Sequence, residues 1–244
     1  MLSSALNVLE IAAHVGLLAR LGVSRVKLPV FAAYLVLNLA QGAVLILAAS
    51  TYPVREYAII WAYGQLLTAL AWVLVSDELR RRVLRGYPGI GSFAAVAVLT
   101  AILGAAAIVW FTSIENRSNL MRLAIFVPRI VASTIAVAML LLLPILKHLN
   151  SPLAPNVVIH ARLLALYFVA RSVTLIIINL GPNPQLVALA GMVLSITCYV
   201  VWAIKLTRAG EVVPLTAKPA DYEPLVSAEA RAASAIATLR HAAR

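Results

Sequence analysis

The hydrophobic residues of this chain fall into long runs with few polar interruptions, unlike the spaced patterns of a soluble protein. Seven of these runs approach or exceed the ~20 residues that an α-helix needs to cross ~30 Å of hydrocarbon. The predicted spans are residues 1–19, 29–50, 57–76, 92–112, 121–146, 157–180 and 185–206. The pattern therefore predicts an all-α polytopic membrane protein, a bundle of seven transmembrane helices.

Residues 1–208 form the predicted transmembrane domain, which leaves no room for a soluble catalytic domain between the spans. Residues 209–244 form the predicted tail. Its first part, from Gly210 to Pro224, contains three prolines and no apolar periodicity, so we expect it to be mostly flexible. The alanine-rich stretch 227–243 could form a short C-terminal helix.

Composition agrees with a membrane protein. The chain is 63% hydrophobic and 12% charged, whereas soluble domains are about one quarter charged. The formal net charge is +11, but the charges lie between the apolar runs, which favours a lipid bilayer as partner over nucleic acid. Cys198 is the one cysteine, so an internal disulfide and a cysteine-only metal site are excluded.

The distribution of basic residues predicts the orientation. Most of the 20 lysines and arginines fall in the first, third and fifth loops and in the tail, with the densest group at residues 80–85. The second and fourth loops hold only Arg55, Arg117 and Arg122. By the positive-inside rule the N-terminus is outside and the C-terminus is cytoplasmic.

Polar residues recur at helical spacing inside the predicted spans, where they are costly and therefore informative. Counted from the outer surface, five helices place polar groups at one level, roughly 12–15 Å deep at ~1.5 Å per residue. The candidate ligand-binding residues of this layer are Glu10, Gln41, Trp61, Gln65, Arg129, Tyr167 and Arg171. The fourth span carries almost no polar residue, so we expect it to pack at the periphery.

Two interpretations of the layer remain open. It could be a structural network in which an arginine forms an ion pair with Glu10. Alternatively, the excess of Arg129 and Arg171 over Glu10 favours an outward-facing cavity for a small anionic ligand or a lipid headgroup, because a guanidinium suits carboxylate and phosphate groups. The resulting functional hypotheses are a receptor-like protein, a transporter of a small anionic solute, and a structural subunit of a larger membrane complex. A proton path through Glu10 and His14 is a further alternative.

No cofactor is predicted. His14 and His160 fall at similar depth near the cytoplasmic side and could in principle ligate a haem, but no pair of histidines on one helix has metal-ligand spacing. Nucleophile and phosphate-loop motifs are also missing from the sequence, so nothing recommends an enzyme. The basic third loop and the tail would suit a membrane or cytoplasmic protein partner.

Two short patterns carry a resemblance. Residues 27–34 (KLPVFAAY) open the second span, and residues 57–63, with Trp61, open the third, which closes on Asp77 and Glu78. Across about residues 25–205 the chain resembles a broad group of small bacterial seven-helix membrane proteins with no assigned activity. The resemblance implies a multi-pass protein of the bacterial inner membrane and carries over no catalytic residue.

Overall fold

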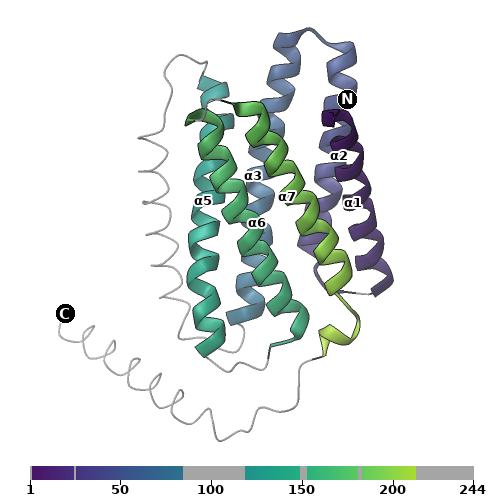
Figure 1. Ribbon diagram of the computed structural model, residues 1–244, viewed down its shortest axis with the longest axis vertical. Coiled ribbons are helices and arrows are strands. Elements are labelled where there is room, and N and C mark those ends of the chain that lie inside the picture. The colour runs from purple at the N-terminus through teal and green to yellow at the C-terminus, as the bar shows by residue number, and fades with distance from the viewer. Residues whose placement is uncertain (1, 25, 85–118, 149–152, 181–182, 213–244) are drawn as a thin grey trace, which may run out of the picture.

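The computed structural model describes residues 2–24, 26–84, 119–148, 153–180 and 183–212 (Figure 1). Its elements are α1 (Leu2–Ser24), α2 (Pro29–Thr51), α3 (Val54–Leu84), α5 (Asn119–His148), α6 (Pro155–Leu180), α7 (Pro184–Lys205) and the short 3-10 helix η1 (Ala209–Glu211). The all-α prediction is confirmed for the described residues. The predicted span 92–112 and the tail beyond residue 212 lie outside the described residues.

Six helices in the described part of the chain are long and apolar enough to cross a membrane. Their outward faces carry large apolar side chains that the protein does not bury, such as Leu47 on α2, Leu70 on α3 and Leu140 on α5. So much exposed apolar surface is rare on a soluble monomer but is expected where lipid is the solvent. The fold is therefore that of a multi-pass helical membrane protein.

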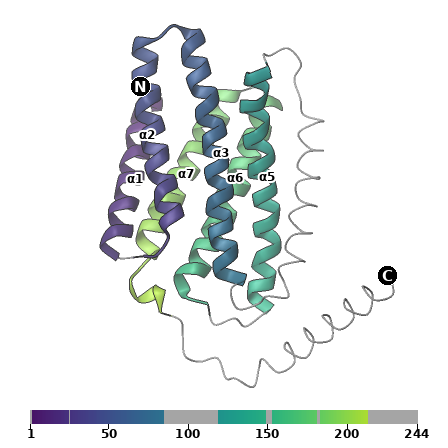
Figure 2. The same cartoon turned by 180° about the vertical axis from the view of Figure 1, so that it is seen from behind.

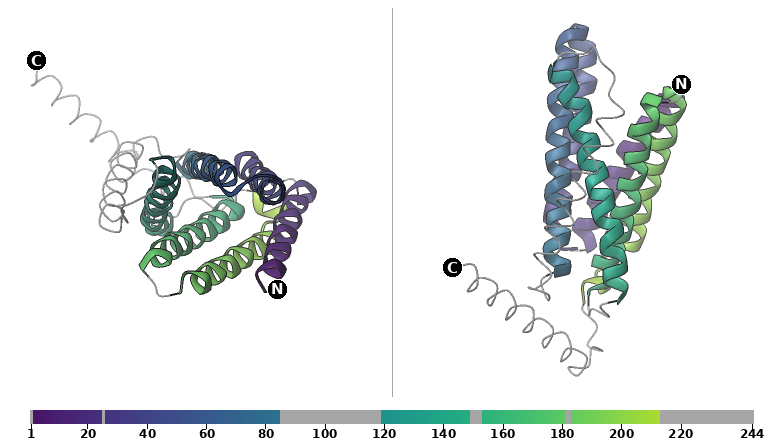
Figure 3. Two further views of the ribbon diagram at one scale, coloured as in Figure 1. Left: turned by 90° about the horizontal axis from the view of Figure 1, so that it is seen from above. Right: turned by 90° about the vertical axis from the view of Figure 1, so that its left-hand side faces the viewer.

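The described helices form a closed ring. Each helix packs against the next in the order α1, α2, α3, α5, α6, α7, and α7 packs against α1 (Figure 3). α3 also contacts α6 across the ring. This contact separates α5 from the space that the other five helices enclose.

Helix direction defines two ends of the bundle. α1, α3, α5 and α7 run down the view of Figure 1, and α2 and α6 run up; Figure 2 shows the same arrangement from behind. We call the end where α1 begins the N-terminal end and the end where α7 finishes the C-terminal end. The basic residues 80–82 of α3 and Lys205 of α7 lie at the C-terminal end, and Arg55 lies at the N-terminal end.

A buried carboxylate joins two helices at the C-terminal end. α2 starts with Pro29, which suits the first helical turn, and the backbone N–H of Phe31 in that turn donates to Oε2 of Glu78 on α3 at 3.1 Å. The other oxygen of Glu78 accepts from Arg82 at 3.2 Å. A negative charge at a helix N-terminus is favoured by the helix dipole, so Glu78 fixes the start of α2 against the end of α3.

Asn156, near the start of α6, holds the segment that follows α7. Its Nδ2 donates to the carbonyl of Thr207 at 2.7 Å and to Glu211 at 2.8 Å, and its Oδ1 accepts from the Thr207 N–H at 3.2 Å. A Cβ on Gly210 would collide with this amide. The 206–211 segment is thereby fastened beneath the bundle.

Candidate functional site

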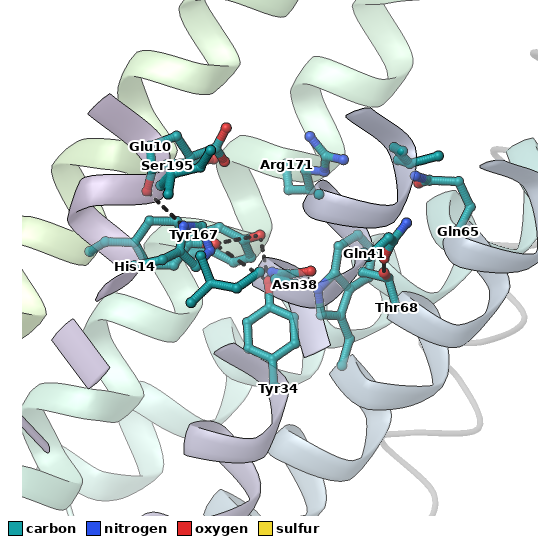
Figure 4. Close-up of a pocket in the computed structure, with 16 residues that line it drawn as sticks. Glu10, His14, Tyr34, Asn38, Gln41, Gln65, Thr68, Tyr167, Arg171 and Ser195 are labelled. Atoms are coloured by element: carbon teal, nitrogen blue, oxygen red, sulfur yellow. Dashed lines mark hydrogen bonds between the residues drawn. The ribbon is translucent and has the colours of Figure 1, made fainter. Parts of the chain in front are cut away.

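A cavity of about 280 Å³ lies inside the ring, between α1, α2, α3, α6 and α7. It extends from the middle of the bundle toward the N-terminal end, and Figure 4 shows the side chains that converge on it. Most of the lining residues are polar: Glu10, His14, Tyr34, Asn38, Gln41, Gln65, Thr68, Trp72, Tyr167, Arg171, Ser195 and Tyr199. A polar cavity at membrane depth is tolerated because protein surrounds it.

The floor of the cavity is a cluster of three tyrosine hydroxyls. Tyr34 of α2 lies 3.0 Å from Tyr167 of α6 and 3.5 Å from Tyr199 of α7, and Tyr199 lies 3.4 Å from Tyr167. The indole N–H of Trp72 on α3 donates to the Tyr34 hydroxyl at 3.2 Å. Four helices therefore meet at one hydrogen-bonded point, which fixes their relative positions.

Below this floor the ring is filled. Phe31, Leu35, Leu79 and Trp202 are at most 2% exposed and pack in one core. Rings stack here as well, with Phe31 and Trp202 centred 4.9 Å apart. The cavity is thus closed toward the C-terminal end by dense packing.

Above the floor lie the charged groups. Glu10 on α1 and Arg171 on α6 sit at the upper level of the cavity, with Gln65 of α3 beyond them (Figure 4). The guanidinium carbon of Arg171 lies 5.8 Å from the centre of the Trp72 ring, a cation–π arrangement. The buried Nε of Arg171 has no hydrogen-bond acceptor in the described part of the chain.

The α1 wall presents His14 one turn below Glu10. Nδ1 of His14 donates to the backbone carbonyl of Glu10 at 2.9 Å, and the imidazole packs on Tyr199 with ring centres 4.0 Å apart. Since Nδ1 carries the proton in this bond, the neutral ring leaves Nε2 as an acceptor. This buried Nε2 has no hydrogen-bond partner among the described residues.

On the opposite side, α2 and α3 approach closely. The hydroxyl of Thr68 donates to Oε1 of Gln41 at 2.6 Å. Gly64, one turn away on α3, leaves space for the Gln41 side chain, whose Cδ would lie 2.9 Å from a Cβ at that position. A Cβ at this position would therefore force the Gln41 amide to shift.

Five of the seven candidate residues come together around this cavity: Glu10, Gln41, Gln65, Tyr167 and Arg171. Trp61 and Arg129 are not among the lining residues. Arg129 is buried, at 5% exposure, but it belongs to α5, which the contact between α3 and α6 separates from the cavity. The cavity lining therefore contains one arginine rather than two.

The expected ion pair of Glu10 with an arginine is not formed by Arg171. Within the described ranges, the ion pairs closer than 4.0 Å join Asp77 to Arg80 and Arg81, and Glu78 to Arg82. Glu10 and Arg171 come from helices that α7 separates in the ring. They face the same space without neutralising each other directly.

Several residues that line the cavity were not predicted from the sequence as site residues. Tyr34, Asn38, Thr68, Trp72, Ser195 and Tyr199 belong to the same polar stripes as the residues that were chosen. Their spacing of three or four residues was the available signal. Three of them lie beside predicted residues, because Tyr34 and Tyr199 contact Tyr167 and Thr68 contacts Gln41.

The two histidines considered as haem ligands lie in different surroundings. His14 lines the cavity, whereas His160 is fully buried between rings, 4.7 Å from Phe31 and 5.7 Å from Trp202 measured between ring centres. Among the described residues no group of three or more His, Cys, Asp or Glu side chains could hold a metal ion.

Comparisons with protein-family models, with curated proteins and with solved structures find no match to this chain. The cavity and the residues that line it are therefore the basis for a functional proposal.

Proposed function

We propose that this chain is a receptor-like membrane protein that binds a small ligand. Arg171 binds the carboxylate or phosphate group of that ligand. The proposal rests on the surroundings of the Arg171 side chain. It lines a cavity at membrane depth, packs on the Trp72 ring and keeps a buried Nε without an acceptor. A guanidinium at such depth is expensive, and an oxyanion that it can bind in a bidentate manner offsets that cost.

The size of the cavity supports a small metabolite as the ligand. Its volume of about 280 Å³ is just below the ~300–1,000 Å³ typical of ligand pockets. Only the headgroup of a lipid would fit into this volume. Transport of a small anionic solute by the same residues is the alternative, but it requires the cavity to open at both ends. The packed core around Phe31 and Trp202 supports a single opening.

The distribution of basic residues supports the orientation of the chain in the membrane that is part of this proposal. Arg80, Arg81, Arg82 and Lys205 gather at the C-terminal end, which we assign to the cytoplasm of a bacterial inner membrane, with the N-terminus outside. α3 and α5 run in the same direction, as two helices with one further span between them in the sequence would. The cavity would then face outward, and the basic cytoplasmic end would meet a protein partner.

Ligand-induced thermal stabilisation of the full-length protein in detergent tests the proposal. The probes are inorganic phosphate, acetate, lactate, succinate and the twenty standard amino acids. A ligand at 100 times its Kd stabilises a protein by about 2.7 kcal/mol, which is readily measured. We expect at least one probe to stabilise the wild type and the Arg162→Gln variant but not the Arg171→Gln variant. Arg162 is an exposed arginine of the same helix outside the cavity. No stabilisation of the wild type by any probe contradicts the proposal.

A transport assay distinguishes a receptor from a transporter. The probe that binds is radiolabelled and added to proteoliposomes containing the wild type or Arg171→Gln. The receptor proposal predicts binding without accumulation inside the vesicles. Uptake by the wild type that Arg171→Gln abolishes would establish a transporter instead. A chain that binds no probe and co-purifies with one stoichiometric membrane protein would be a structural subunit.

A further inference from the structure

We infer that the ligand is a zwitterion of the α-amino acid type, whose carboxylate meets Arg171 and whose ammonium group meets Glu10 and His14. This inference rests on the proposed function and names its ligand class. It replaces a purely anionic ligand, which depended on a second arginine in the cavity.

The first argument is the balance of formal charge. Arg171 is the one arginine or lysine and Glu10 is the one acidic residue among the sixteen side chains described as lining the cavity. A monovalent anion would neutralise Arg171 and leave Glu10 uncompensated at membrane depth. A simple cation would do the reverse. A ligand carrying both charges compensates both residues, which is the least costly arrangement in a low-dielectric site.

The second argument is that the lining contains one donor atom and one acceptor atom without hydrogen-bond partners. Two buried atoms of the lining lack partners within the described residues: Nε of Arg171 and Nε2 of His14. The first is a donor. The second is an acceptor, because Nδ1 of the same ring donates to the Glu10 carbonyl. Both atoms are covered by neighbouring protein atoms, so a ligand reaches them only when the two side chains turn toward the cavity; a carboxylate then accepts from the first and an ammonium donates to the second.

The third argument is the separation of the two charged walls. No ion pair within 4.0 Å joins Glu10 to Arg171, although a direct pair would be the simplest way to hold both charges in a membrane. α7 holds their helices apart in the ring, and Ser195 of α7 also lines the cavity. The cavity, at about 280 Å³, has room for a molecule of a few heavy atoms in the space that both residues face.

Matched analogues test the inference. From the best-binding amino acid two compounds are derived, one without the amino group and one without the carboxylate; for alanine they are propionate and ethylamine. Affinities are measured by thermal shift and by competition on full-length protein in lipid nanodiscs. The variants are Glu10→Gln and Arg171→Gln, with Arg162→Gln as the control.

We expect the wild type and Arg162→Gln to bind the amino acid at least tenfold more tightly than either analogue. Glu10→Gln should lose that preference, so that the amino acid and its deaminated analogue bind equally. Arg171→Gln should lose affinity for the amino acid and for the deaminated analogue alike. The wild-type ratio of amino acid to analogue tests the inference even where a variant fails to fold.

The possible failures are distinguishable. If the wild type binds propionate as tightly as alanine, or if Glu10→Gln leaves their ratio unchanged, the zwitterion inference is wrong while a carboxylate site on Arg171 stands. If a folded wild type binds no amino acid and no analogue, the zwitterion inference is wrong; if it also binds none of phosphate, acetate, lactate and succinate, the proposed function is wrong as well.

Discussion

The guanidinium carbon of Arg171 lies 5.8 Å from the centre of the Trp72 ring, so an aromatic face rather than a carboxylate holds this membrane-depth cation. Trp72 is 2% exposed, and its indole N–H donates to Tyr34 at 3.2 Å. One side chain therefore supports both the charged upper level of the cavity and its tyrosine floor. Its partnership with Arg171 leaves the guanidinium donors available to a ligand.

Trp72→Phe should weaken both parts of the cavity. The substitution removes the donor to Tyr34 and part of the cation–π attraction, and we expect a loss of about 1–3 kcal/mol of stability. Ligand-induced stabilisation should fall as well. Thermal unfolding with and without the best probe measures both effects. Trp61→Phe, on the same helix but outside the cavity lining, is the control. Equal effects of the two substitutions would argue against a special role for Trp72.

Glu78→Gln should lower stability through the start of α2. The substitution removes the charge that accepts from the Phe31 N–H and from Arg82, and a charge at a partly buried helix N-terminus contributes about 1–2 kcal/mol. The neighbouring variant Asp77→Asn is a matched control. Its ion pairs with Arg80 and Arg81 lie at the surface, where such pairs contribute at most about 1 kcal/mol. Chemical unfolding in mixed micelles compares the two, and a larger loss for Asp77→Asn would contradict this account of the helix start.

Gly64→Ala should disturb the cavity wall. A methyl group there collides with the Gln41 side chain and breaks its 2.6 Å hydrogen bond with Thr68, which should cost about 1–3 kcal/mol. Gly16→Ala, where a Cβ meets nothing within 4 Å, should leave stability unchanged or raise it slightly. The measurement is the unfolding midpoint of each variant. Equal tolerance at the two glycines would show that α2 and α3 do not approach as described.

Thiol labelling of intact cells tests the orientation. Cysteines replace Tyr52, at the turn between α2 and α3 near the N-terminal end, and Arg81, at the C-terminal end. A membrane-impermeant maleimide should label Tyr52→Cys and should not label Arg81→Cys until the cells are opened. Native Cys198 is 1% exposed, so the unmodified chain should remain unlabelled. The opposite labelling pattern would reverse the assignment of inside and outside.

Much of the helical framework follows from hydrophobic run length, because every span must cross the same thickness of hydrocarbon. The predicted second span, 29–50, corresponds to α2 at Pro29–Thr51. The third was predicted to end at residue 76, but α3 continues to Leu84. Run length cannot detect this extension, since charged residues such as Asp77 and Arg81 continue a helix through pairs one turn apart.

The site could be predicted only in part, because counting residues gives depth along a helix but not its neighbours in the ring. Depth placed Glu10 and Arg171 correctly in one cavity. The same count included Arg129, whose helix α5 is separated from the cavity by contact between α3 and α6. That contact depends on side-chain packing between distant segments, and a single sequence does not reveal it.

Native mass spectrometry of the gently purified full-length protein tests the central claim most directly. The wild type should carry one additional small mass, that of a zwitterionic metabolite, and Arg162→Gln should carry the same mass. Arg171→Gln should be bare while keeping its helical circular dichroism. A bare wild type whose thermal stability no carboxylate, phosphate or amino acid changes would contradict the account. An added mass retained by Arg171→Gln would likewise place the ligand elsewhere.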